Sequence, residues 1–120
     1  MNKRARDARA ALRRRSADTR FEASLLRGRA LATHFLAAGV DDVKAIKGAA
    51  SGLSAAAKRI GIAPVRHGRT LRTVDGHRFR KWSPVGHYSR AQLPALVNAY
   101  NPRKPEYRAA LDALRYSLAA

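Results

Sequence analysis

Cysteine is absent from the 120-residue sequence, which excludes disulfide bonds, thiolate metal sites and cysteine nucleophiles. Acidic residues are scarce as well. The eight Asp and Glu residues are dispersed along the chain, which argues against a two-metal centre. The four histidines show no metal-ligand spacing, and no grouping of Ser, His and an acid suggests a hydrolase. We therefore expect a protein that is not an enzyme and that holds no metal or cofactor.

Long apolar runs are also missing, since no uninterrupted stretch approaches the length of a bilayer span. We therefore expect a cytoplasmic protein with no membrane partner. Large aromatic side chains are few, and much of the hydrophobic content is alanine. Alanine favours helices but offers little apolar area to bury, so the sequence predicts a single small, helix-rich core.

Positive charge is the dominant feature, with 25 Lys and Arg residues giving a formal net charge of +17. A compact chain with this excess repels itself unless a polyanion neutralises it, and nucleic-acid backbones are the commonest polyanions. Residues 1–39 carry ten basic and three acidic groups, residues 40–92 eleven and three, and residues 93–120 four and two. The 19 arginines suit bidentate contacts to guanine and phosphate, although G+C-rich coding bias explains them equally well. We expect a nucleic-acid-binding, nucleoid-associated protein.

The first 60 residues read as a basic arm followed by helices. Residues 1–17 cannot bury an apolar face, so they are disordered in isolation or helical against phosphates. Ser16 or Asp18 can cap a helix that Gly39 stops. The Asp41-Asp42 pair suits the start of the next helix.

A break is expected at Ser51-Gly52, inside this second helical stretch. Ser54 would then cap a separate short helix over residues 53–60, and Gly61 would stop it.

A hairpin follows, with strands over residues 70–74 and 77–82 around an Asp75-Gly76 turn, and Ser83-Pro84 as its end. Phe79 and Trp82 could stack on unpaired bases, but packing of these rings against the core is favoured.

The last third of the chain predicts two more helices. Ser89 and Gln92 form a capping-box pattern, and Pro94 implies a distorted or delayed first turn. The C-terminal stripe of Tyr107, Leu111, Leu114 and Leu118 is expected to dock on the body or on a second copy. The second alternative, together with the usefulness of two half-sites on DNA, predicts a homodimer.

Residues 55–62, AAAKRIGI, and the later segment 86–90, GHYSR, with Leu93, resemble MerR-type regulators and phage excisionases. The resemblance covers residues 53–97 and implies a winged helix-turn-helix that binds duplex DNA. The recognition helix of those families would fall at residues 64–73, where Arg66, His67 and Arg69 would face the bases. Gly68 interrupts this helix, however.

In a second register, favoured slightly, residues 42–50 form the first helix, residues 53–60 form the recognition helix, and residues 65–82 form the wing. Ser54, Lys58 and Arg59 would then face the bases.

The sequence thus predicts a mainly α protein with a small β-hairpin wing, arranged as a winged helix-turn-helix. Its parts are a basic arm (1–17), a DNA-binding domain (18–101) and a C-terminal helix (102–120). The predicted function is sequence-preferring binding of double-stranded DNA, as a transcriptional regulator, phage-type repressor or excisionase. The alternatives are an RNA- or ribosome-associated protein and a sequence-blind architectural protein. The predicted DNA-binding residues are Arg4, Arg13, Arg14, Ser54, Lys58, Arg59, Arg66, His67, Arg69, Arg72, Arg78, Arg80 and Lys81.

Overall fold

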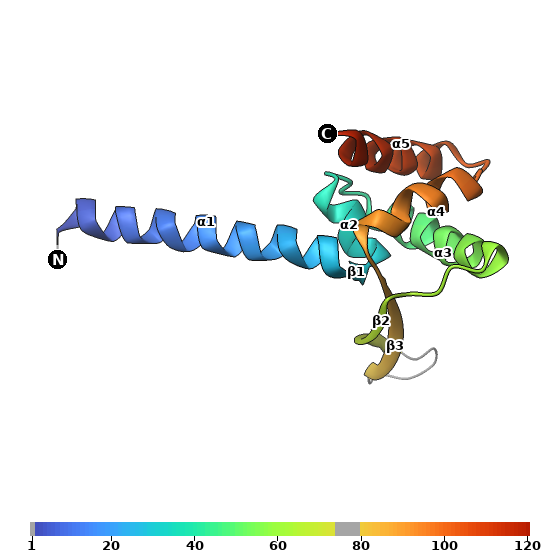
Figure 1. The fold of residues 1–120 in the computed structure, drawn as a ribbon, viewed down its shortest axis with the longest axis horizontal. Coiled ribbons are helices and arrows are strands. Elements are labelled where there is room, and N and C mark those ends of the chain that lie inside the picture. Colours follow the sequence, from blue (N-terminus) through green and yellow to red (C-terminus); the bar gives the residue numbers. More distant parts are fainter. Residues whose placement is uncertain (1, 74–79) are drawn as a thin grey trace.

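The computed structural model describes residues 2–73 and 80–120, which are mainly helical with a small three-stranded antiparallel sheet (Figure 1). This confirms the coarse fold class. The elements are α1 (Lys3–Arg27), β1 (Arg29–Ala30), α2 (Leu31–Ala37), α3 (Val43–Ile60), β2 (Arg66–Thr73), β3 (Arg80–Tyr88), the 3-10 turn η1 (Arg90–Gln92), α4 (Leu93–Ala99) and α5 (Pro105–Ala119).

The basic arm is part of one long helix, α1. Its cap is Asn2, whose Oδ1 accepts a hydrogen bond from the Ala5 N–H at 2.8 Å. The expected helix start at Ser16 or Asp18 is wrong, because α1 runs unbroken past residues 17 and 18. Its Ala, Arg and Leu residues are strong helix formers, and no residue before Gly28 interrupts them.

Helix α1 is separated from the next elements, β1 and α2, by Gly28, and not by a helix start capped at Ser16 or Asp18. The φ of +148° at Gly28 is accessible to glycine, and a Cβ atom there would lie 2.6 Å from Cγ2 of Val65. The helix expected up to Gly39 is therefore divided into the end of α1, the short strand β1 and α2, which does end just before Gly39.

α3 is a single helix, so the break expected at Ser51-Gly52 is wrong. Asp42 caps it as predicted, with Oδ1 accepting from the N–H groups of Lys44 (3.1 Å) and Ala45 (3.3 Å). Gly61 ends it with φ +80°.

Glycine has a packing role inside α3 instead. A Cβ atom at Gly48 or Gly52 would collide with the ring of Tyr107 or Tyr100 respectively. These two positions let α3 lie close to the C-terminal segment without bending the helix.

Neither predicted helix pair is present. Residues 42–50 and 53–60 belong to the same helix, and residues 66–73 of the other expected recognition helix form strand β2. Short turns instead connect α2 to α3 and α4 to α5, and of these two pairs α2 and α3 precede the hairpin.

The hairpin is longer than expected. Strands β2 and β3 pair from Arg66 with His87 to Thr73 with Arg80, and β1 joins the other side of β3 in the order β1-β3-β2. The expected end at Ser83-Pro84 is wrong, because β3 continues through these residues to Tyr88. Strand β1 pairs with β3 only at residues 87 and 88. Pro84 therefore sits where β3 has one neighbouring strand, and its missing N–H can face the open edge. The expected turn at Asp75-Gly76 lies outside the described residues.

The C-terminal helix packs into the core of its own chain. Leu111 and Leu114 are buried in the same cluster as Phe35, Leu53 and Leu96, and Leu118 packs against it. The stripe therefore docks on the body, one of its two expected partners, and homodimerisation stays a prediction. The turn before α4 matches expectation, since the Ser89 N–H donates to Oε1 of Gln92 at 2.9 Å and Pro94 lies in the first turn of α4.

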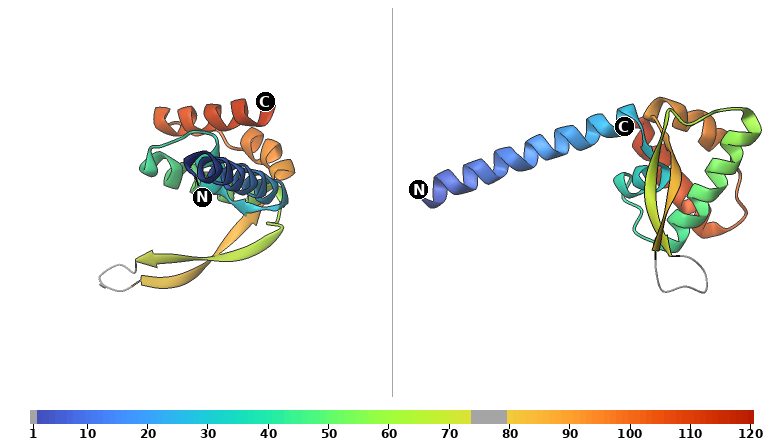
Figure 2. Two further views of the ribbon diagram at one scale, coloured as in Figure 1. Left: turned by 90° about the vertical axis from the view of Figure 1, so that its left-hand side faces the viewer. Right: turned by 90° about the horizontal axis from the view of Figure 1, so that it is seen from below.

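Two projections leave the helical body in different directions. α1 extends away as an isolated rod, and the β2–β3 hairpin extends from another side of the body (Figures 1 and 2). The described molecule measures 56 × 41 × 28 Å along its principal axes.

Candidate nucleic-acid interface

A continuous exposed stripe runs along α3. Lys44, Lys47, Ser51, Ala55 and Lys58 are exposed, and their spacing of three or four residues places them on one face of the helix. Helix α3 contains no acidic residue, so nothing on it offsets the three lysines. The stripe has cationic ends and small side chains at its centre, where half-buried Ser54 adds a second hydroxyl.

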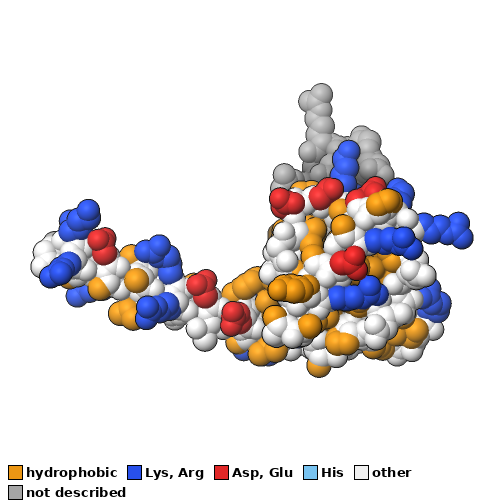
Figure 3. Space-filling model, turned by 90° about the horizontal axis from the view of Figure 1, so that it is seen from above, with side chains coloured by type: hydrophobic (Ala, Val, Ile, Leu, Met, Phe, Trp, Pro, Cys, Tyr) orange, Lys and Arg blue, Asp and Glu red, His pale blue; other side chains and the backbone are white. Residues whose placement is uncertain are grey.

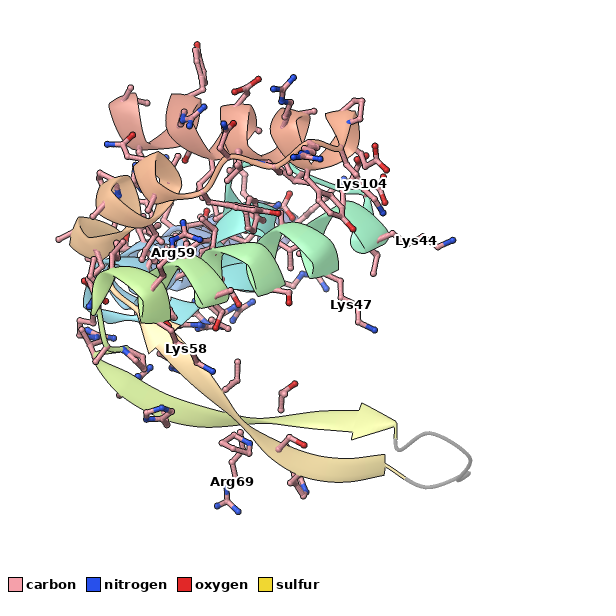
Figure 4. The ribbon with its side chains drawn as sticks, turned by 90° about the vertical axis from the view of Figure 1, so that its right-hand side faces the viewer. Lys44, Lys47, Lys58, Arg59, Arg69 and Lys104 are labelled. Carbon is pink, nitrogen blue, oxygen red and sulfur yellow. The ribbon has the colours of Figure 1, made fainter. Side chains whose placement is uncertain are left out.

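The stripe faces the side of the body on which the hairpin lies. In Figure 4, Lys47 and Lys58 project from α3 toward the hairpin side, and Lys44 extends past the N-terminal end of the helix. Sequence reasoning missed Lys44 and Lys47 because it assigned them to a different helix from Lys58. Reading α3 as one helix would have shown that the three lysines share a face.

The outer face of the hairpin carries a mixed basic and aromatic surface. Arg69 on β2 pairs with Pro84 on β3, so these two residues share one face of the hairpin. Trp82 lies two residues before Pro84 on β3, and because side chains alternate along a strand, it lies on the same face. Figure 4 shows Arg69 pointing away from α3. His67 is also exposed and lies two residues before Arg69 on β2.

Trp82 is not the core anchor that the sequence suggested. Its side chain is 61% exposed, so the favoured packing interpretation is wrong for this ring. Trp82 belongs to β3, in the hairpin that extends below the helical body in Figure 1. Phe79, the other ring in that expectation, lies outside the described residues.

Two predicted site arginines make contacts within the fold. The Arg59 guanidinium donates to the Ala99 carbonyl at the end of α4. Arg66 donates from Nε to Nδ1 of His87 at 3.1 Å and from NH2 to the Gly28 carbonyl at 3.2 Å. Burial, followed by the charge of Arg66, lowers the pKa of His87, which keeps Nδ1 free to accept this bond. These contacts hold α4 to α3 and the base of the hairpin to the end of α1.

The other predicted residues fall into three groups. Arg4, Arg13 and Arg14 are exposed on α1, which the fold separates from the stripe on α3 (Figure 1). Arg72, Arg80 and Lys81 occupy paired strand positions, but their side chains are not among those described. Arg78 lies outside the described residues altogether.

Carboxylates neutralise little of this charge. Among the described residues, the one ion pair joins Arg115 and Asp112 on α5, with a 3.4 Å separation between NH1 and Oδ1. Among the described side chains, the lysines of α3, Arg69 on the hairpin and most arginines of α1 are therefore exposed without a carboxylate partner.

Comparison of the chain with protein-family models, curated proteins and solved structures gives no match. Within the described ranges, no helix combines the length and apolarity needed to cross a bilayer.

Proposed function

We propose that this chain is a non-catalytic, sequence-preferring protein that binds double-stranded DNA, and that α2 and α3 form its helix-turn-helix. In this assignment α3 is the recognition helix and the β2–β3 hairpin is the wing. The exposed stripe on α3 carries the proposal, because it combines a cationic helix face with the absence of any acidic residue on that helix.

The dimensions of the stripe fit a major groove. Eleven residues separate Lys47 from Lys58, which corresponds to about 16 Å along a helix axis. The groove is roughly 12 Å wide, so lysines near both ends of an inserted helix can reach phosphates on its two sides. Ser51, Ser54 and Ala55 lie between them, and such short side chains let the helix backbone approach the base edges.

Supporting features come from the elements on either side of α3. The order of a helix pair, then a basic hairpin, then another helix is that of a winged helix-turn-helix. On this basis we propose a role as a transcriptional regulator, phage-type repressor or excisionase, the roles implied by the resemblance to MerR-type proteins and excisionases.

The test is a pair of two-charge variants of the full chain. We expect K47Q/K58Q to weaken duplex binding about tenfold or more and to reduce the slope of log affinity against log salt by about two, one for each phosphate that the variant no longer neutralises. R103Q/K104Q removes two exposed charges from the turn before α5 and should change affinity by less than about threefold. Equal reductions in the two variants, with circular dichroism unchanged, would contradict the proposal.

An RNA-binding function is a second candidate, and the exposure of Trp82 favours it. An exposed ring and an arginine on the same face of a two-stranded hairpin form an arrangement on which unpaired bases stack. The two candidates differ in the surface they use, since duplex binding depends on α3 and stacking depends on the outer face of the hairpin.

A further inference from the structure

Most of α1 has no tertiary support. Leu25 is its one buried residue, and Phe21 and Ser24 in the same turns contact Arg29, with the Arg29 guanidinium 5.7 Å from the Phe21 ring centroid. The preceding turns extend into open space, where even Leu12 is 63% exposed (Figure 1). The exposed turns of α1 that precede Phe21 are therefore suited to a ligand that lies along the helix.

The charges of α1 are sorted by face. Arg6, Arg9, Arg13, Arg20 and Arg27 recur at helical spacing and fall within about 60° of one another at 100° per residue. We call these five residues the arginine face.

All three acidic residues of α1, Asp7, Asp18 and Glu22, project from roughly the opposite side of the helix. The remaining basic residues, Lys3, Arg4, Arg14 and Arg15, lie outside the arginine face. Negative charge is thus kept away from one side of the rod.

The arginine face is directed to the same side of the molecule as the hairpin. Figure 3 shows the acidic side chains of α1 in the view from above, and Figure 1 shows the hairpin extending below the body. The arginine face, opposite the acids, therefore points downward. A duplex held against the head, meaning α3 and the hairpin, lies on this side of α1.

The five arginines are exposed and make no ion pair or side-chain hydrogen bond within the described ranges. Arg6 and Arg27 are 21 residues apart, which corresponds to about 32 Å and so to roughly one turn of B-DNA. Their mutual repulsion is relieved when a polyanion lies along them.

We propose that the arginine face binds phosphates of the same DNA duplex, beyond the segment contacted by the head. This inference rests on the proposed function. It retains Arg13 among the predicted arm contacts, replaces Arg4 and Arg14 by Arg6, Arg9, Arg20 and Arg27, and extends the bound site by about ten base pairs.

Two triple variants of the full chain test this assignment. R6Q/R13Q/R20Q removes three charges from the arginine face, whereas R4Q/R14Q/R15Q removes three from the remainder of α1. Glutamine is nearly as good a helix former as arginine, so both variants should keep the helicity measured by circular dichroism. Binding is measured with a duplex of about 15 base pairs, long enough for the head, and one of about 30 base pairs, one to two turns longer.

We expect the wild-type chain and R4Q/R14Q/R15Q to bind the longer duplex more tightly than the short one. R6Q/R13Q/R20Q should not show this increase, so that its affinity for the longer duplex is about tenfold or more below that of the control variant, and its salt slope should fall by about two to three. Affinity for the short duplex should differ little between the two variants.

Other outcomes would overturn the inference in distinguishable ways. Equal reductions in both variants would show a response to net charge without a preferred face. Short-duplex binding without any length-dependent increase would remove the role of α1 and leave the head as proposed, whereas no duplex binding by the wild-type chain would overturn the proposed function itself. A change of molar mass in light scattering of R6Q/R13Q/R20Q without DNA would instead assign the face to a second copy of the chain.

Discussion

Among single residues, His34 makes a buried link between α2 and the sheet. It is 3% exposed, and its Nε2–H donates to the Tyr88 carbonyl at 2.7 Å. Burial lowers the pKa of His34 below 6.5, and this outweighs the hydrogen bond to Tyr88, which raises it; the nearby charges of Arg90 and Arg29 lower it further. Burial therefore favours the neutral imidazole in the folded chain at neutral pH.

This burial predicts acid sensitivity of the fold. Because the folded-state pKa lies below the unfolded value, the unfolded chain binds the proton first as the pH falls. The contribution of His34 to the free energy of unfolding should be complete above pH 6.5 and decline below it. Denaturant unfolding at about pH 7.5 and 5.5 should show a larger decrease in stability for the wild-type chain than for H34Q, whose amide can donate to Tyr88 but does not titrate. Identical decreases would show that His34 is not the group responsible.

The roles of some single residues could not be predicted from the sequence. The sequence indicated that Arg59 and Arg66 are basic, but it could not show that the carbonyls of Ala99 and Gly28 take up their guanidinium groups, because these partners are 40 and 38 residues distant. Trp82 was misjudged for the same reason, since its exposure depends on how far the hairpin extends from the helices.

At the scale of the element, the continuity of α3 depends on its packing against the C-terminal segment. The ring of Tyr100 occupies the space that a side chain at Gly52 would need. We expect Gly52→Ala to lower the free energy of unfolding by about 1–3 kcal/mol through overpacking, despite the roughly 1 kcal/mol gain in helix propensity. Ser51→Ala, at the neighbouring exposed position, should stay within about 0.5 kcal/mol. A more stable Gly52→Ala variant in denaturant unfolding would show that Tyr100 does not pack against α3.

The bounds of helices could be predicted from the sequence where residues within or next to the helix determine them. Asp42 and Gly61 bound α3 by their own capping geometry, and the periodic stripe from Tyr107 to Leu118 defines α5 without reference to other segments. The failures arose where tertiary contacts decide. Gly52 looks like a helix break until Tyr100 is placed beside it, and the division of α1 from α2 depends on Gly28 passing Val65. The candidate stripe was only partly predicted, because joining Lys44 and Lys47 to Lys58 requires the unbroken helix.

At the scale of the whole molecule, the fold places its cations on elements that extend from or border the body. α1 and the hairpin project, α3 exposes its lysines on the hairpin side, and α4 and α5 close the core with the near-neutral part of the chain (Figures 1 and 4). This arrangement leaves α1, α3 and the hairpin exposed, and the net charge of +17 would favour an extended anionic ligand.

The central claim is that this ligand is duplex DNA. Its most direct test is a competition titration, in which the full chain is bound to a labelled duplex of about 30 base pairs, roughly three helical turns, at several salt concentrations, and unlabelled duplex or structured RNA of equal length is added. We expect duplex DNA to compete at least about tenfold better than RNA, and log affinity to fall with log salt at a slope of about −5 or steeper, as phosphate-dominated binding requires. Displacement by RNA at lower concentrations than by duplex DNA, or a slope near zero, would contradict the claim.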